Sequence, residues 1–587
     1  MCGIVGEYLF EKHNIDNNYK LLLDKIKSRG PDYSGYILKD RIFLGHSRLS
    51  IIDLSAASNQ PFEDSESNLC MVYNGCIYNY LDIRKQLIKK GYLFKTSGDT
   101  EVVIKSFIEW GHDCLKKFEG DFALAIWNNK KKELFLARDR FGVKPLYYAN
   151  EKNFFRFGST LQSIITKKDI DLELDPKSMH MHFSLHAVVP APNTIFKNIK
   201  KVPPGHFLVI GIENKVVMKQ YWSLKKVEDN NYIIDEKEAL DLTRESLIDS
   251  INKRLSASDI DVGVLLSGGL DSSLIVALAR ENFPSLKTYS IGFDDDHEEK
   301  GSEFYYSDQV VKKFNTKHKK FIIDNNSVLD KLPEAFNSMS EPMVAQDAIA
   351  FYMLSELVSK EVKVVLSGQG ADEAFAGYFW YQKINLEKNN YKNFAKHYFD
   401  RGSEELRKFL NLELELDFTS LMVEKKFKDI NNKKLISNVL NFDITTLVVD
   451  DPVKRVDNMT MAWGLEARVP FLDHKLVELS SRIDPNLHLL RNGKKILKDI
   501  SDELLPKEVI SRKKGYFPMP ALKFIRGKYY NFVYDILNSS ECYNRNIYNK
   551  NYIDMLLEKP NEYKTAIDGN KLWHAAATEL WFQQNLD

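Results

Sequence analysis

The strongest constraint on the fold lies at residues 260–282, where an apolar strand pattern, a glycine turn and a helical pattern follow one another directly. The turn reads SGGLDSS (267–273), and its two glycines allow the backbone to bend tightly and expose its N–H groups. The positive end of the following helix points at the same place. The unit predicts a pyrophosphate site, although it is not a Walker A loop, because the lysine of that motif is absent.

Strand and helix patterns continue to alternate, which predicts a doubly wound parallel α/β sheet. Strands are expected at 260–266, 286–293, 318–323 and 362–366, and helices at 271–282 and 303–314. A second glycine loop, SGQGADE (367–373), follows the last strand, at the edge where such sheets bind ligands. Asp271 and Asp372 are candidate Mg²⁺ ligands there. Each loop alone is compatible with an ordinary turn, but the pair favours a ligand site.

The first third of the chain has the pattern of β-rich layers with a few helices, whereas the chain beyond about residue 378 reads as mostly helical. In the first third, strands are expected at 2–10, 42–53, 69–73, 122–127 and 133–138, and helices at 19–28, 80–90 and 100–118. A polar stretch at 225–236 breaks the pattern, and a helix is expected next, at 238–255. We therefore expect two domains, 1–224 and 237–587, joined by a linker.

Cys2 is a candidate nucleophile, because removal of the initiator methionine would leave its thiol and a free amine on one residue. An α-amine titrates near ~8 and a free thiol near ~8.5, so both groups are close to working pH. A buried, inert cysteine is the alternative interpretation of this position.

Charge and cysteine content exclude some classes of function. Lys+Arg and Asp+Glu both total 82, so a general nucleic-acid or membrane-surface binder, which needs a basic excess, is not expected. Five cysteines in 587 residues, with no CxxC pair, indicate a reducing compartment instead of a disulfide framework or a structural zinc site. No signal peptide or membrane-spanning run is visible. We expect a cytoplasmic protein with small-molecule substrates, and a homodimer is compatible with the sequence.

Several motifs resemble those of one known family. In the first half these are CGI (2–4), RGPD (29–32), GHSRLSIID (45–53), YNG (73–75), SGDTE (97–101) and ARDRFGVKPLY (137–147). They resemble a class II glutamine amidotransferase domain, and the two glycine loops resemble the synthetase domain of glutamine-hydrolysing asparagine synthetases. The resemblance covers nearly the whole chain. It implies an αββα N-terminal-nucleophile glutaminase sandwich, followed by an ATP-pyrophosphatase-type synthetase domain with a helical carboxyl-terminal part.

For the first domain, the resemblance implies that Cys2 attacks the side-chain amide of glutamine and releases ammonia. Asn74 and Gly75 would donate to the oxyanion, Arg48 would pair with the substrate α-carboxylate and Asp99 with its α-ammonium. Cys76 would complete the glutamine pocket. Taken singly, these residues have other interpretations: a surface ion pair for Arg48, a hairpin turn at 74–75 and a helix cap for Asp99.

For the second domain, the resemblance implies that ATP adenylates a carboxylate and that ammonia then displaces AMP. Asp271 and Asp372 would bind Mg²⁺. Lys514 would stabilise the adenylation transition state, although Lys513 could take this place and a solvated basic turn is the alternative. The residues implied in ATP binding are Leu266, Ser267, Gly268, Gly269, Asp271, Ser272, Ile291, Ser367 and Gly368.

Three positions depart from the family pattern. Cys76 replaces a glutamate, Gln369 replaces an acid that is thought to assist ammonia attack or substrate binding, and the usual EPxxD becomes EPMVA, with Asp347 two places later. The sequence at these positions resembles that of N-acetylglutaminylglutamine amide synthetases, a narrower group of enzymes that make an osmoprotectant. This resemblance favours the carboxyl-terminal carboxylate of that acetylated dipeptide as the acceptor, with aspartate as the alternative.

Two other functions are compatible with parts of the sequence. A stand-alone hydrolase using Cys2 would need no second site, and an interaction protein would need neither site. Intact SGGLDSS, Asp372 and Lys514 argue against the first, and the presence of Cys2 and Asp271 argues against the second. The acidic run 294–299 is expected to be solvated surface, or else a loop that closes over the acceptor.

Overall fold

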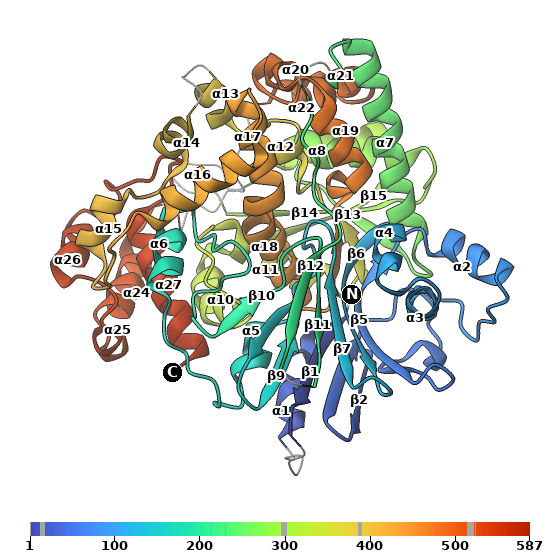
Figure 1. Ribbon diagram of the computed structural model, residues 1–587. Coiled ribbons are helices and arrows are strands. Elements are labelled where there is room, and N and C mark those ends of the chain that lie inside the picture. The colour runs from blue at the N-terminus through green and yellow to red at the C-terminus, as the bar shows by residue number, and fades with distance from the viewer. Residues whose placement is uncertain are drawn as a thin grey trace.

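The computed structural model describes residues 2–11, 18–212, 214–228, 231–294, 302–385, 390–512, 522 and 524–587. The first 220 residues form two six-stranded antiparallel sheets, in the lower part of Figure 1. The first sheet, ordered β10-β8-β9-β1-β3-β2, contains β1 (Gly3–Leu9), β2 (Tyr33–Lys39), β3 (Ile42–Arg48), β8 (Tyr147–Asn150), β9 (Phe154–Gly158) and β10 (Ile199–Lys201). The second, ordered β12-β11-β7-β6-β5-β4, contains β4 (Phe62–Asp64), β5 (Leu69–Ile77), β6 (Gly120–Asn128), β7 (Glu133–Arg138), β11 (His206–Ile210) and β12 (Val216–Gln220).

Alternation along the strands builds a four-layer αββα sandwich, as expected. In β1, Ile4 faces the core between the sheets, whereas Val5 packs on the outer face beneath α1. In β5, Val72 faces the inner core and Tyr73 the outer helices α2 and α3. The helices of this half are α1 (Tyr19–Asp24), α2 (Tyr80–Lys89), α3 (Asp99–Trp110), α4 (Cys114–Lys117), α5 (Leu161–Ile165) and α6 (Pro176–Ser184).

The second half is organised around a five-stranded parallel sheet of order β15-β14-β13-β16-β17. Its strands are β13 (Val262–Leu265), β14 (Lys287–Phe293), β15 (Lys317–Ile323), β16 (Val364–Leu366) and β17 (Glu466–Arg468). Both faces of the sheet are covered, since Val264 and Leu265 contribute to different apolar clusters. Chain order reverses between β13 and β16, which is where a doubly wound sheet opens a crevice.

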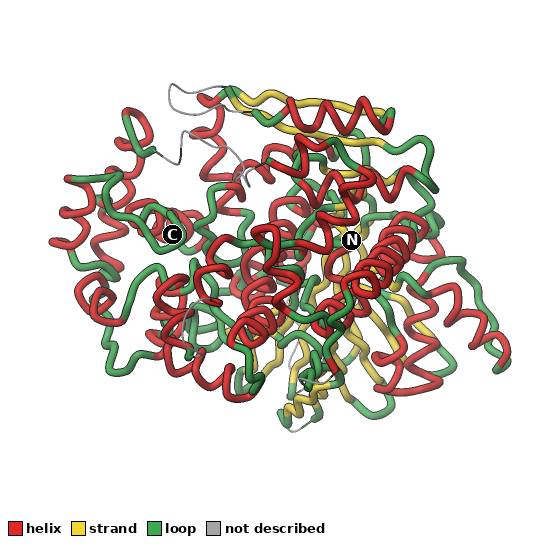
Figure 2. The backbone as a smooth tube through the Cα atoms, turned by 90° about the horizontal axis from the view of Figure 1, so that it is seen from above, coloured by secondary structure: helices red, strands yellow, loops and turns green. Residues whose placement is uncertain are grey.

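Helices enclose this sheet and make up the carboxyl-terminal part, around the terminus marked C in Figure 2. The helices that precede, connect or follow the strands of this sheet include α7 (Glu236–Ser256), α8 (Leu270–Arg280), α9 (Phe304–Phe314), α10 (Asn325–Asn337), α11 (Asp347–Val358), α12 (Ala371–Ala374), α18 (Lys454–Met461), α19 (His474–Arg482), α20 (Pro485–Leu489), α21 (Lys495–Leu504) and α22 (Lys507–Ser511). The others are α13 (Phe379–Asn385), α14 (Tyr391–Tyr398), α15 (Ser403–Phe409), α16 (Phe418–Ile430), α17 (Leu435–Phe442), α24 (Gly527–Leu537), α25 (Ser540–Arg545), α26 (Lys550–Glu558) and α27 (Lys571–Asn585).

All of the expected strands and helices occur, with shifted ends. The expected helix 100–118 ends at Trp110, because Gly111 adopts a φ of 56°, and the chain resumes helical structure as α4. The expected strand 42–53 ends at Arg48. Asn74 and Gly75 lie inside β5, so the hairpin-turn interpretation of this pair is wrong. β2, β4, β8–β12 and β17 were not expected.

The two halves share one continuous core and several buried ion pairs. Helix α6 and the segment after it pack with α27 in the same apolar cluster, although they belong to the first half of the chain. Arg29 donates to both carboxylate oxygens of Asp457 on α18, at 2.8 and 3.1 Å, with both side chains almost fully buried. Lys201 bridges Glu341 and Asp450 at 3.0 and 2.8 Å. These contacts hold the sandwich and the parallel-sheet half as one body.

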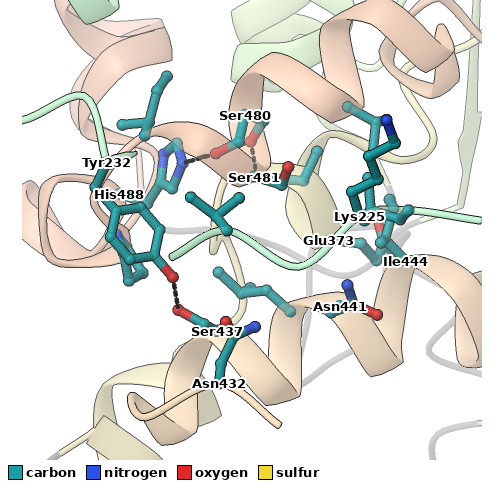
Figure 3. A pocket seen from close by; sticks show the side chains of 17 residues that line it. Lys225, Tyr232, Glu373, Asn432, Ser437, Asn441, Ile444, Ser480, Ser481 and His488 are labelled. Carbon is teal, nitrogen blue, oxygen red and sulfur yellow. Dashed lines mark hydrogen bonds between the residues drawn. The ribbon is translucent and has the colours of Figure 1, made fainter. Parts of the chain in front are cut away.

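The segment expected to be a linker also packs against the second half. Figure 3 shows Lys225 and Tyr232 of this segment beside a small cavity of about 40 Å³. The Tyr232 hydroxyl is hydrogen-bonded to the Ser437 hydroxyl at 3.1 Å, and His488 Nε2 is hydrogen-bonded to the Ser480 carbonyl oxygen. A cavity of this size holds only a few water molecules, so we regard it as a packing gap and not a ligand site.

We predict that Asp457→Asn lowers the free energy of unfolding by about 3–5 kcal/mol, because it leaves the buried Arg29 guanidinium without its carboxylate. Urea denaturation measures the effect. The matched control is Asp554→Asn, which removes an exposed pair with Lys550 and should cost well under about 1 kcal/mol. Equal shifts in the two variants would show that the buried pair does not stabilise the junction.

Candidate active sites

The first site surrounds Cys2, at the start of β1. The Cys2 backbone nitrogen donates to Asn74 Oδ1 at 2.9 Å, and Arg29 Nε donates to the Cys2 carbonyl oxygen at 3.2 Å. Burial raises the pKa of the Cys2 thiol, and a hydrogen bond from the backbone N–H of Leu49 acts in the opposite direction. The backbone of Cys2 is therefore held by two hydrogen bonds, and the Leu49 N–H lies beside its sulfur. Cys2 lines a cavity of about 30 Å³.

Asn74 and Gly75 lie within β5; Gly75 lines the Cys2 cavity, and Asn74 contacts the Cys2 backbone. Asn74 is fully buried, and its Nδ2 amide group has no hydrogen-bond partner among the described residues. A buried, unsatisfied N–H is costly, so it marks a place where a ligand oxygen would be stabilised. A side chain at Gly75 would place its Cβ 2.3 Å from the carbonyl oxygen of Asp121, so only glycine fits here.

Arg48 and Asp99 also line the Cys2 cavity, and both are buried. The Arg48 guanidinium donates to Ser55 O at 2.8 Å and to Asn59 Oδ1 at 2.7 Å, so it holds the 52–59 segment instead of making a surface ion pair. Asp99 accepts from the Tyr73 hydroxyl at 2.8 Å and from the Ile77 N–H at 3.1 Å. Burial raises the pKa of Asp99, which a bound cation would reverse.

Asp99 is the first residue of α3 and Gly98 is the cap, so the helix-cap interpretation of Asp99 is wrong. Cys76 lines the cavity as well, beside Gly75. The charged groups around Cys76 include Arg468 and Glu466, and its burial raises the pKa of the thiol above the usual range.

Glu466 and Arg468, which sequence reasoning did not identify, complete the first site from the second half of the chain. They lie on β17, form a buried ion pair at 2.5 Å and line the Cys2 cavity. Burial alone would raise the pKa of Glu466, but positive charges, among them Arg468 and Lys144, hold it well below its ordinary value. The one available signal was the pair of charges inside the apolar run 459–472.

The second site lies at the carboxyl ends of β13 and β16. Gly268 has a φ of 74°, and a Cβ there would lie 2.5 Å from the Ser307 nitrogen, so glycine is required. The hydroxyl groups of Ser267 and Ser272 are hydrogen-bonded to each other at 3.2 Å across the turn, and the Gly269 N–H donates to Ser267 Oγ. The loop thus presents hydroxyl groups and N–H groups at the start of α8.

Asp271 and Asp372 come together here, as the sequence predicted, with Lys494 between them. Lys494 Nζ lies 2.7 Å from a carboxylate oxygen of each, and burial of the lysine is outweighed by these charges, so its pKa is raised. Two carboxylates that share one cation have the spacing and oxygen chemistry that Mg²⁺ uses. Lys494 itself was not predicted. It follows Arg491 and Asn492, and all three have positive φ, a strained conformation that often marks functional segments.

A cavity of about 960 Å³ opens beside these groups, near the upper end of the ~300–1,000 Å³ typical of ligand pockets. Its lining includes Ser267, Gly269, Asp271 and Asp372 among the predicted residues. Leu266, Ser272, Ser367 and Ile291 are buried and do not line this cavity. A Cβ at Gly368 would approach that of Asp271 to 3.1 Å. Lys513, Lys514 and residues 295–299 lie outside the described residues.

The fold and the two sites define a class of protein: an N-terminal-nucleophile glutaminase-type sandwich joined to a parallel-sheet synthetase-type domain. Comparison with known proteins agrees. The glutamine amidotransferase domain family matches residues 1–222, and the asparagine synthase family matches residues 242–583. The chain belongs to the asparagine synthase family and carries an amino-terminal glutamine amidotransferase domain.

Relatives match over most of their length. Glutamine-hydrolyzing asparagine synthetase 1 of Bacillus subtilis (strain 168) is 30% identical, over 100% of this chain and 97% of its own. Synthetase 3 of the same organism is 31% identical, over 88% and 87% of the two chains. Asparagine synthetase B of Escherichia coli (strain K12) is 26% identical, over 88% and 82%. Among the described residues, no helix has the length and apolar character needed to cross a bilayer.

Proposed function

We propose that the protein is a glutamine-dependent amidotransferase, a carbon–nitrogen ligase that uses ATP. The observation that carries this proposal is the pairing of β16 with β17. β16 leads directly into the second glycine loop, while its neighbour β17 supplies Glu466 and Arg468 to the Cys2 cavity. The Ser367 N–H donates to the Arg468 carbonyl oxygen at 2.9 Å, so one pair of strands belongs to both sites.

In the first step, Cys2 Sγ attacks the side-chain amide carbon of glutamine, and the carbonyl electrons move onto oxygen. Asn74 Nδ2 stabilises that oxyanion, since its N–H is buried and unsatisfied beside the Cys2 nitrogen. The thiol proton passes to the departing nitrogen through the α-amine of Cys2, which is free once the initiator methionine is removed. Collapse of the intermediate then expels ammonia and leaves a thioester. Water attacks the thioester carbon, which releases glutamate and restores the thiol. Asp99 holds the substrate ammonium group, which restores the charged state of its carboxylate.

We infer that the 52–59 segment moves when glutamine binds, because the guanidinium that holds this segment also lines the Cys2 cavity. Arg48 is the residue that holds this segment, through the Ser55 carbonyl and Asn59 side-chain oxygens. A substrate carboxylate would replace these oxygens as the partner of the guanidinium. Arg48 would then couple closure of the segment to the presence of substrate.

In the second step, the acceptor carboxylate attacks the α-phosphorus of ATP and pyrophosphate leaves. Ammonia then attacks the acyl carbon, and AMP leaves with the electron pair of the broken bond. The 267–273 loop binds the phosphates through its N–H and hydroxyl groups. Asp271 and Asp372 would hold Mg²⁺, which screens phosphate charge when it is bound. Lys494 pairs with both carboxylates, and it would be free to contact the phosphates if a metal ion took its place.

We propose N-acetylglutaminylglutamine as the acceptor, with free aspartate as the second candidate. Gln369 supports the first, because the neutral amide replaces an acid of the asparagine-forming pattern. Tyr378 and the half-exposed Phe379 provide an apolar wall to the 960 Å³ cavity, which suits a dipeptide better than a small charged amino acid. The names of the relatives fit aspartate, so the experiment decides between the two acceptors.

We propose that residues 225–236, in the segment between β12 and α7, link domain 1–224 to domain 237–587. A reducing compartment such as the cytoplasm fits the five unpaired cysteines. A homodimer remains a prediction from the sequence.

The division of labour is tested with Cys2→Ala. We expect loss of product formation from glutamine and nearly normal formation from added ammonium, because the second site is intact. The control is Cys542→Ser, a cysteine of α25 outside both sites, which should keep both activities. Loss of the ammonium-dependent reaction in folded Cys2→Ala protein would contradict the two-site scheme. Release of AMP and pyrophosphate separates this scheme from a stand-alone hydrolase.

The acceptor is tested by incubating the enzyme with ATP, Mg²⁺ and glutamine together with either N-acetylglutaminylglutamine or aspartate. Mass spectrometry identifies the amidated product, and AMP gives the rate. We expect the dipeptide amide as the main product. Efficient formation of asparagine without dipeptide amide would reject the proposed acceptor, yet leave the reaction type in place.

A further inference from the structure

A buried His–Asp–His cluster lies away from both sites, between three separate segments of the chain. His186 follows α6, Asp400 follows α14, and His574 is in the first turn of α27. Asp400 and His574 are almost fully buried, whereas the His186 side chain is 15% exposed. One ligand atom from each residue lies within 4.8 Å of the other two. None of these residues has a role in the proposed amidotransferase reaction.

The two imidazoles of this cluster lie unusually far from the carboxylate for groups that pair with a charge, although the His186–Asp400 contact is within the range of a long hydrogen bond. His186 Nδ1 and His574 Nδ1 lie 3.3 and 3.4 Å from the same atom, Asp400 Oδ2. Bonds to a charged carboxylate are normally about 2.7–2.9 Å long. Other buried histidines of this protein reach that range: His180 lies 2.7 Å from the Thr419 hydroxyl, and His182 lies 2.9 Å from the Thr578 hydroxyl.

The same distances suit donors arranged around a metal ion. Zn²⁺ takes histidine nitrogen and carboxylate oxygen at about 2.0–2.2 Å, so two donors of a tetrahedral site stand roughly 3.3–3.5 Å apart. Both imidazole-to-carboxylate distances fall there. The second carboxylate oxygen, Asp400 Oδ1, is buried and has no hydrogen-bond partner among the described residues.

We propose that His186, Asp400 and His574 form a binding site for a divalent transition-metal ion of the Zn²⁺ type. Two imidazoles and one carboxylate are the donors that Zn²⁺ and its neighbours in the first transition series prefer. A fourth position is left to water on the partly exposed side of His186. The donor set does not suit Mg²⁺ or Ca²⁺, which require oxygen ligands.

The bound ion would tie the end of the first half to the carboxyl-terminal helices. The Asp400 N–H donates to the Ser184 carbonyl oxygen at 2.9 Å. The segment after α14 is therefore joined to the end of α6 without an ion. His186 and Ala187 both have positive φ, a strained conformation that three ligand bonds would stabilise. The function of the site is therefore structural, at the junction that α6 makes with α27.

The test is a Zn²⁺ titration of EDTA-treated full-length protein against a chromophoric chelator. We carry it out with Cys2→Ala protein as well as wild type, to remove the thiol of the first site as a competing ligand. We expect one equivalent to bind with a Kd below about 1 µM in both. His186→Gln and His574→Gln should each weaken binding at least about 100-fold, more than loss of a residue that only supports a ligand.

His180→Gln is the matched control, because it removes a buried histidine of α6, the helix that precedes His186, and this histidine is hydrogen-bonded to Thr419 instead of Asp400. It should bind Zn²⁺ like wild type. Co²⁺ bound to wild type should show visible bands without the near-ultraviolet band of a thiolate ligand. Zn²⁺ should raise the thermal midpoint of wild type but not of folded His186→Gln protein.

Absence of stoichiometric binding in wild type, or equal binding in wild type and both site variants, would overturn the proposal. The cluster would then be a loosely hydrogen-bonded group around Asp400. These readouts are independent of amidotransferase activity, so failure of the metal site and failure of the proposed reaction are distinguishable.

Discussion

The parallel pairing of β16 with β17 is the interaction that relates the two sites to each other. Leu366 pairs with Arg468, and the next residue, Ser367, begins the second glycine loop. Arg468 is fully buried with Glu466, an arrangement that is stable only when the remaining N–H groups are satisfied. The carbonyl oxygens of Arg254 and Ala257 accept from its Nη1, which fixes the side chain beside the Cys2 cavity. Its Nη2 group is buried and has no hydrogen-bond partner among the described residues, so the guanidinium is only partly satisfied.

Further contacts join the two halves around this pairing. The sandwich and the parallel sheet share an apolar cluster, and Arg29–Asp457 and Lys201–Glu341 add buried charge pairs across the junction. Breaking such a pair is costly, since it leaves one uncompensated charge in the interior. Cys2 and the 267–273 loop are therefore held in a fixed relation, as transfer of a small reactive molecule between them requires.

Much of the fold could be predicted from local patterns. The strand–SGGLDSS–helix unit and the alternation after it define the parallel sheet, and the motifs around Asn74 and Asp99 locate the Cys2 site. Glu466 and Lys494 could not be predicted, because their place depends on contacts with residues hundreds of positions away. β17 has three residues and the 491–494 segment has no regular pattern, so neither carries a periodic signal.

The most direct test of the account is the origin of the nitrogen in the product. The enzyme is supplied with glutamine labelled with ¹⁵N in its side-chain amide, in buffer that contains excess unlabelled ammonium, and the amidated product is analysed by mass spectrometry. If ammonia passes directly between two sites that share one pair of strands, the product should keep most of the label. A product whose label is diluted to the level of the bulk ammonium would contradict that claim.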